Sequence, residues 1–432
     1  MKPPIIYNLF PRLVGPTTRW VEHADRALEM GFNWLYLNPW HYPGFSGSLY
    51  APKELWRMNP LFQPPGADTH SLEPLVEFLA AMRERDLPVM MDLVIGHTSK
   101  DSPLISAHPE WFVRDASGQV QSPFVRDPDD PSRITVWGDL AELDHERSPD
   151  RDALWEYWVA ITERALGLGF SGFRCDAAYK IPAALWCRLI ERAKAQSPDA
   201  EFFAETLGAP LEPVIALRDA GFDYFFNSSK WWNLSDPWAL EQHATLGRIA
   251  PSISFPESHD TARLAEESGG REQVQRQRYA LAAAFSAGVM MPIGYEFGFR
   301  TPLNVVTTQP SDWERRRWDL RPFITRVNLL KRHHWLLHGE GSLTASWGLH
   351  GDLLLLERRV SHGGRGNGWI LINKVWDESR EASLRAAPLA EAGEGYRLYR
   401  VCRDDSLPGG EPLPDQIRLD PAEVVYVLPQ RK

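Results

Sequence analysis

The chain has 432 residues, of which 24% are charged, and a formal net charge of −10. That length suits one large domain with a smaller one. The acidic balance and the lack of any run of lysine and arginine argue against nucleic acid or an anionic membrane as a partner. No apolar run approaches a membrane span, and the N-terminal MKPPIIYNLFPRLVG lacks the apolar core of a signal peptide. The three cysteines, Cys175, Cys187 and Cys402, lack zinc-type spacing, so we expect a reduced, cytoplasmic protein.

Short apolar runs alternate with amphipathic helical stretches over residues 5–293, which predicts βα units around a parallel sheet. Helices are predicted at 18–30, 71–85, 151–168, 182–196 and 271–287. Strands are predicted at 5–10, 33–38, 87–94, a run ending at 174–176, 201–205, 222–226, 253–255 and 289–293. Eight such strands close a (β/α)8 TIM barrel, which we assign to residues 1–97 and 149–338.

Two segments depart from this alternation. Residues 98–148, after the third strand, are polar and rich in proline and aspartate, and they are too long for an ordinary βα loop. We interpret them as an inserted excursion over the barrel mouth. Beyond residue 338 the pattern changes to short strands with glycine and proline turns, which predicts an all-β domain, a β-sandwich, over residues 339–432. The stretch after the second strand, PWHYPGFSGSLYAPKELW, is interpreted as a loop.

Polar side chains end four of the predicted strands. They are Asp92 and His97, Arg174 and Asp176, Glu205, and His259 and Asp260. The carboxyl ends of the strands form the active face of such barrels, so these side chains should converge. Arg174 and Asp176 are alternate residues and point the same way, and an arginine beside a carboxylate keeps it ionised, as a nucleophile must be. Taken alone, this pair is equally well explained as a structural ion pair at a strand end.

Carboxylates on adjacent strands suit double displacement at a sugar. Asp176 would attack the anomeric carbon, and Glu205 would protonate the leaving oxygen. Asp260 would stabilise the positive charge that develops on the ring. Its negative charge would also help to keep the pKa of Glu205 high.

Several motifs resemble those of the α-amylase family, glycoside hydrolase family 13. They are DLVIGH, GFRCDAA, FFAET and FPESHD, together with GFSGSLY at residues 44–50. The resemblance covers about residues 5–297 and implies roles for individual residues. It implies that Asp176 is the nucleophile, Glu205 the acid/base and Asp260 the transition-state stabiliser. It also implies that His97 and His259 hold hydroxyls of the reacting glucose and that Tyr50 stacks on the sugar. In the same resemblance, Arg174 positions Asp176, and Asp92 supports Arg174. The segment HPEWFVRDASG also resembles maltosyltransferases that use maltose 1-phosphate.

Two positions depart from the family pattern. Gly96 replaces the asparagine that often ligates a structural calcium, and Ser258 replaces the asparagine of the last motif. The three carboxylates are unaffected, and we predict no metal or other cofactor. Asp139, Glu142 and Asp144 could bind a metal, although a solvated acidic loop explains them more simply.

The expected function is retaining hydrolysis of α-1,4 bonds in an α-glucan or maltooligosaccharide. The alternative is transfer of the glucosyl or maltosyl group to another sugar, since the two differ only in how well the acceptor site excludes water. A non-catalytic sugar-binding relative is the remote alternative, because such relatives lose the three carboxylates and this sequence keeps all three. The sequence does not decide whether four residues lie in the core, on the surface or at the sugar site: Trp231, Trp232, Tyr179 and Lys180.

Overall fold

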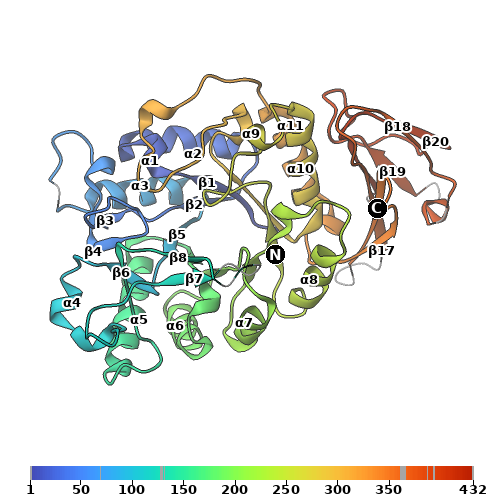
Figure 1. Cartoon of the computed structure of the whole chain (residues 1–432). Helices are drawn as coiled ribbons and strands as arrows, with labels where there is room; N and C mark the ends of the chain where they lie inside the picture. Colours follow the sequence, from blue (N-terminus) through green and yellow to red (C-terminus); the bar gives the residue numbers. More distant parts are fainter. Residues whose placement is uncertain are drawn as a thin grey trace.

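The computed structural model describes residues 2–68, 70–126, 130, 132–360, 366–386, 388–392 and 395–430. Its centre is a closed parallel barrel, which confirms the predicted fold class (Figure 1). Neighbours in the barrel follow chain order, and β1 closes on β14 with Ile5 opposite Val289. The strands are β1 (Ile5–Leu9), β2 (Trp34–Leu37), β5 (Val89–Leu93), β10 (Gly172–Cys175), β11 (Glu201–Glu205), β12 (Tyr224–Phe226), β13 (Ser252–Ser254) and β14 (Gly288–Pro292).

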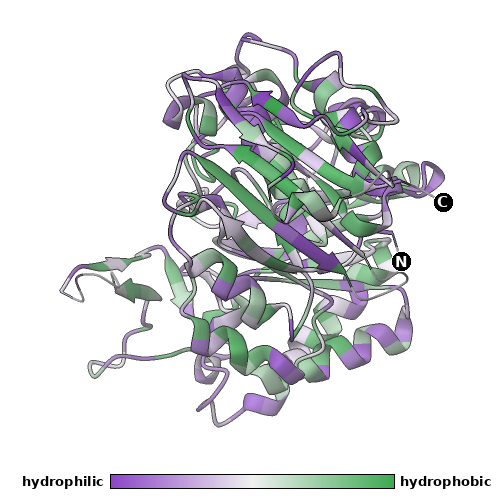
Figure 2. Ribbon diagram, turned by 90° about the vertical axis from the view of Figure 1, so that its right-hand side faces the viewer, coloured by the Kyte–Doolittle hydropathy of each residue, from purple (hydrophilic) through white to green (hydrophobic). Residues whose placement is uncertain are grey.

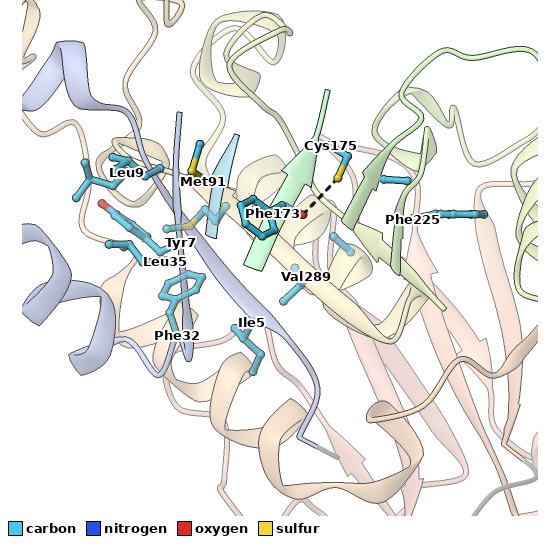
Figure 3. Packing of buried hydrophobic residues seen from close by; sticks show 14 of the residues in the cluster. Ile5, Tyr7, Leu9, Phe32, Leu35, Met91, Phe173, Cys175, Phe225 and Val289 are labelled. Carbon is cyan, nitrogen blue, oxygen red and sulfur yellow. Dashed lines mark hydrogen bonds between the residues drawn. The ribbon is translucent and has the colours of Figure 1, made fainter. Parts of the chain in front are cut away.

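The barrel strands are buried on both faces, because successive side chains point alternately into the barrel and out toward the helices. One cluster of buried side chains, which includes Ile6, Tyr36 and Phe203, fills the interior. The alternate residues pack outward in a second, larger cluster, and Figure 3 shows Phe173 and Cys175 of β10 among them. Figure 2 shows helices on which hydrophobic and hydrophilic stretches alternate, as expected of helices that pack on one side and face solvent on the other.

The predicted helices are all present, and the structure adds others that the sequence analysis did not assign. The longer helices are α2 (Trp20–Glu29), α3 (Glu73–Glu84), α5 (Arg151–Leu168), α6 (Ala183–Gln196), α8 (Trp238–Leu246), α10 (Glu272–Phe285) and α11 (Arg321–His333). Single-turn helices are α1 (Pro11–Val14), α4 (Leu104–Ala107), α7 (Leu211–Ile215) and α9 (Leu264–Glu267). Helix α11 buries Phe323, Ile324 and Val327 on one side, so its sequence did carry an amphipathic signal.

The excursion after the third barrel strand lies beside the barrel mouth and is attached by an antiparallel pair, β6 (His97–Ser99) with β9 (Leu140–Glu142). It also carries a hairpin of β7 (Phe124–Arg126) and β8 (Ile134–Val136). The loop predicted after β2 is instead partly ordered as the hairpin β3 (His41–Pro43) and β4 (Pro52–Met58). Its prolines and irregular register hid the strand pattern, because proline is usual only at edges and bulges of sheets.

The C-terminal part is all-β, as predicted. A five-stranded antiparallel sheet follows the order β15, β16, β17, β21, β19, and a two-stranded sheet pairs β18 with β20. Their bounds are β15 (Ser342–Trp347), β16 (Leu353–Val360), β17 (Gly366–Asn373), β18 (Arg380–Ser383), β19 (Tyr396–Tyr399), β20 (Gln416–Leu419) and β21 (Val424–Pro429). Contacts with α10, such as Gln277 Nε2 donating to the Asn373 carbonyl at 2.6 Å, join this part to the barrel. The predicted domain boundaries stay a prediction. No helix in the described ranges has the length and apolar character needed to cross a membrane.

Candidate active site

The polar strand ends predicted from the sequence do converge. A cavity of about 610 Å³ opens at the carboxyl ends of the barrel strands, between the barrel and the excursion. Of the predicted site residues, it is lined by Tyr50, His97, Arg174, Asp176, Glu205 and Asp260. Asp92 and His259 are buried, and each bonds to the hydroxyl of Tyr50. Strand order brings Asp92, Arg174 and Glu205 together, since β5, β10 and β11 are adjacent in the barrel.

Arg174 is the cation at the centre of the carboxylates. Its Nη1 donates to Asp92 Oδ1 at 2.9 Å and to Asp176 Oδ1 at 2.7 Å. Its Nη2 lies 3.7 Å from Asp260 Oδ2 and 4.0 Å from Glu205 Oε2. The Arg174 side chain is only 5% exposed, so little solvent screens these interactions. The arrangement fixes the Asp176 carboxylate and offsets the repulsion among the acids.

Glu205 has the surroundings of a proton donor. Burial raises its pKa to about 7; Arg174 opposes this shift, and the charges of Asp176 and Asp260 add to it. Two backbone N–H groups hold its carboxyl group, from Leu207 to Oε1 at 2.7 Å and from Ala177 to Oε2 at 3.0 Å. Ala177 has a φ of 41°, an unusual left-handed conformation for a residue with a side chain. The residue after Asp176 is thus bent so that its N–H points at Glu205.

Tyr36 and Asn38, which the sequence analysis did not single out, also belong to the hydrogen-bond network of the site. Tyr36 and Tyr50 each donate a hydroxyl proton to Asp92 Oδ2. Asn38 Nδ2 donates to both hydroxyls at 3.1 Å. Burial raises the pKa of Asp92, and Arg174 opposes that shift. Tyr36 in β2 and Asn38 directly after it are polar residues two apart in an apolar stretch, and this alternation was the available signal for an inward-facing polar pair.

Both histidines contact Tyr50. A ring nitrogen of His97 (Nε2) lies 2.9 Å from the Tyr50 carbonyl, and the ring of His259 stacks on the Tyr50 ring with centroids 5.4 Å apart. His259 Nε2 is also 3.1 Å from Asp260 Oδ2. Burial lowers the pKa of both histidines, which favours neutral rings near pH 7. Neutral imidazoles can exchange hydrogen bonds with sugar hydroxyls.

The structure shows where the four residues left undecided by the sequence lie. Trp231 lines the cavity and is half exposed, whereas Trp232 is buried in the core. Tyr179 and Lys180 also line the cavity, and the Lys180 ammonium lies 4.9 Å from the centre of the Trp137 ring. Trp137 comes from the excursion and was not singled out in the sequence. Together these groups form a partly aromatic wall beyond the carboxylates.

The acidic residues of the excursion also face the cavity. Asp139, Glu142 and Asp144 line its wall. Among the described residues, the group with metal-like spacing is a different one, His108, Glu110 and Asp150, whose possible ligand atoms lie within 4.8 Å of one another. Gly96, at the departure from the family pattern, accepts a hydrogen bond from Leu143 N–H through its carbonyl at 3.0 Å.

Comparison with solved structures identifies the fold. The crystal structure of an α-amylase from Lactobacillus plantarum superimposes with a TM-score of 0.75 at 20% identity, covering 98% of both chains. The chain has the fold of the α-amylase family, glycoside hydrolase family 13. A trehalulose synthase variant of that fold gives a TM-score of 0.76 at 14% identity, covering 98% of this chain and 99% of the other.

Sequence comparisons match one family model and several curated proteins that are named as transferases. A family model described as the glucanotransferase domain of glycogen debranching enzyme matches residues 5–125. The α-1,4-glucan:maltose-1-phosphate maltosyltransferase of Burkholderia pseudomallei is 27% identical over 372 residues, which is 82% of this chain and 31% of that protein. The enzyme of the same name from Myxococcus xanthus is 26% identical over 375 residues, 82% of this chain and 53% of that protein. The chain therefore spans about a third to a half of the length of these curated relatives.

Proposed function

We propose that this chain is a retaining α-glucan transglycosylase, which moves a glucosyl or maltosyl group between α-1,4-linked sugars. One observation carries the proposal: Asp176, held by Arg174, and Glu205, with a pKa of about 7, face the same cavity. The names of the sequence relatives favour transfer over the hydrolysis that the sequence analysis placed first.

The residues suggest a two-step reaction. Asp176 attacks the anomeric carbon while Glu205 gives its proton to the departing glycosidic oxygen, which yields a β-linked glycosyl-enzyme. Glu205, now ionised, takes the proton from an acceptor hydroxyl as that oxygen attacks the same carbon. Two inversions restore the α configuration. Asp260, next to Arg174, stabilises the positive charge on the ring in both transition states.

The charge of the cavity favours a neutral donor. Carboxylates dominate its lining: Asp139, Glu142, Asp144, Glu146, Asp176, Glu205 and Asp260. The basic side chains there are Arg147, Arg174 and Lys180, and Arg174 is already engaged with Asp92 and Asp176. Arg147 is 77% exposed and lies 3.7 Å from Asp144. A phosphate dianion would be repelled by such a wall, whereas an uncharged maltooligosaccharide would not.

The second candidate is transfer from maltose 1-phosphate, the donor in the names of the relatives. Lys180 is the basic residue that could approach such a phosphate, because its ammonium faces the cavity beside Trp137. The two candidates differ in whether phosphate is released and in whether Lys180→Met abolishes transfer.

Product analysis tests the proposal. Maltopentaose incubated alone should give shorter and longer oligosaccharides, and labelled glucose or maltose should enter the products as acceptor. Maltose 1-phosphate should be a poor donor, with Asp176→Asn as the inactive control. Phosphate release and chain extension from maltose 1-phosphate, without redistribution of maltopentaose, would select the second candidate. If only shorter free sugars form, the reaction is hydrolysis rather than transfer. If neither donor is turned over, the proposed function is refuted.

A further inference from the structure

The loop between β13 and α9 carries two site residues, His259 and Asp260. The Asp260 side chain is 47% exposed, so packing in the cavity wall does not fix it. Local hydrogen bonds within the loop shape its tip: Asp260 N–H donates to Ser258 Oγ at 3.2 Å, and Ser258 N–H donates to Thr261 Oγ1 at 2.9 Å. The Asp260 carboxylate also lies near Arg174 and His259, and the path of its backbone depends on how the ends of this loop are held.

A buried ion pair joins those two ends. Arg263 Nη1 donates to Glu257 Oε1 at 2.8 Å, and the backbone N–H of Leu264 donates to Glu257 Oε2 at 2.6 Å. The side chain of Glu257 is fully buried, and that of Arg263 is 1% exposed. Both carboxylate oxygens are thus engaged across the base of the loop, which becomes a closed ring of residues 257–264.

Arg263 also anchors this ring to the barrel. Its Nη2 donates to the Ile293 carbonyl, just after β14, at 2.9 Å, and its Nε donates to the Thr301 carbonyl at 3.1 Å. Neither Glu257 nor Arg263 is among the described residues that line the cavity. The pair therefore lies outside the cavity lining and is connected to Asp260 through the backbone of the loop.

We propose that Glu257 and Arg263 are positioning residues, which hold Asp260 where its charge faces the reacting sugar ring. The inference rests on the proposed function for its effect on rate. A buried ion pair adds little net stability compared with apolar residues of the same volume, because both charges lose their hydration. Its value here is geometric, since four directed hydrogen bonds specify one conformation of the loop. A displacement of about 1 Å at a reacting centre can reduce the rate by about 100-fold.

Arg263→Lys is the main test, because lysine keeps a positive charge near Glu257 but cannot reach all three acceptors. We expect kcat to fall by about 10- to 100-fold with KM nearly unchanged. The loss should be equal for maltooligosaccharides and for α-maltosyl fluoride, because Asp260 acts on both transition states. Glu257→Gln should show the same pattern, and the double variant Glu257→Leu/Arg263→Met removes both buried charges if a single variant fails to fold.

The matched control is a buried ion pair far from the cavity, Arg400 with Glu423 in the C-terminal part, with side chains 11% and 2% exposed. Arg400→Lys should lower the melting temperature to a similar degree and leave kcat unchanged. If Arg263→Lys also lowers only the melting temperature, the pair is merely structural and the inference is overturned.

A crystal structure of Arg263→Lys gives a readout that does not depend on turnover. A shift of the Asp260 carboxylate supports the inference, and superposition of the loop on the wild type overturns it, whatever the substrate proves to be. An inactive wild-type enzyme with a shifted loop in the variant would instead count against the proposed function alone.

Discussion

At the scale of a single residue, Glu205 shows how burial changes the properties of a carboxyl group. Its two carboxyl oxygens accept hydrogen bonds from backbone N–H groups, which fix the orientation of the carboxyl group. Burial in the surrounding protein raises its pKa to about 7. Asp176 is instead bonded directly to Arg174. Two carboxylic acids in one cavity thus receive different environments, the usual basis for dividing acid and nucleophile roles.

The raised pKa of Glu205 predicts that kcat/KM decreases on the alkaline side of the pH profile. Because the protonated form is the proton donor, kcat/KM for maltooligosaccharides should fall as pH rises through about 7, by about tenfold for each further unit. An α-glycosyl fluoride needs little protonation of its leaving group, so its profile should lack this limb. The measurement is kcat/KM for both substrates from pH 5 to 9. Identical alkaline limbs for the two substrates would assign the titration to another group.

Replacing each carboxylate separately should produce different failures. Asp176→Asn removes the attacking oxygen, so turnover should fall by on the order of 10⁴-fold or more, for glycosyl fluorides as well. Glu205→Gln should recover the first step with a glycosyl fluoride and accumulate the glycosyl-enzyme, which azide should resolve without a base. Single-turnover kinetics and intact-mass detection distinguish the variants. Fluoride rescue of Asp176→Asn, but not of Glu205→Gln, would reverse the two roles.

At the scale of an element, β10 shows how alternation separates chemistry from packing. Arg174 faces into the barrel, where it meets Asp92 of β5, and Cys175 packs outward in the cluster under the helices (Figure 3). The Cys175 thiol has no exposed surface, and burial raises its pKa well above the usual range. One strand therefore carries a site residue and a core residue side by side.

Thiol reagents should consequently spare the activity. Cys175 is inaccessible and poorly ionised, whereas Cys187 is partly exposed on α6, away from the cavity. We expect iodoacetamide to modify Cys187 in the folded protein with little loss of rate, with Cys187→Ser as the unlabelled control. Rapid inactivation that maltose prevents would contradict this placement of Cys175.

At the scale of the whole molecule, the excursion and the barrel meet through direct protein contacts around the cavity. The Leu143 N–H bond to the Gly96 carbonyl and the 2.6 Å contact of His145 Nε2 with the Ile95 carbonyl join the two parts, and the β6–β9 pair closes the excursion next to this junction. Gly96 takes part through its backbone, so this junction does not use a side-chain ligand at that position. The cavity wall formed by the excursion is held by these bonds.

Chelation should therefore leave the enzyme active. After treatment with EDTA and gel filtration, we expect the rate and the melting temperature to stay within about 10% and 1 °C of the untreated protein, changes well below those of a lost structural contact. Complete loss of activity that calcium restores would contradict this. If EDTA lowers only the melting temperature, the variant Glu110→Gln shows whether His108, Glu110 and Asp150 hold the ion.

The sequence by itself determined the barrel and the identity of the polar strand ends. Both depend on local signals, the alternation along strands and the position of charged residues where apolar runs stop, so Asp176, Glu205 and Asp260 could be named before their geometry was known. The predicted roles of these residues await the tests above.

Only the tertiary structure decided what surrounds them. The Tyr50 hydroxyl lies 2.7 Å from His259 Nε2 across 209 residues of chain, and no periodicity encodes such a pairing. The same holds for Tyr36 on Asp92, for Trp231 rather than Trp232 at the cavity, and for Trp137 over Lys180. Strand patterns specify the direction of a side chain, whereas its partners depend on loops whose paths are set by packing across the whole barrel mouth.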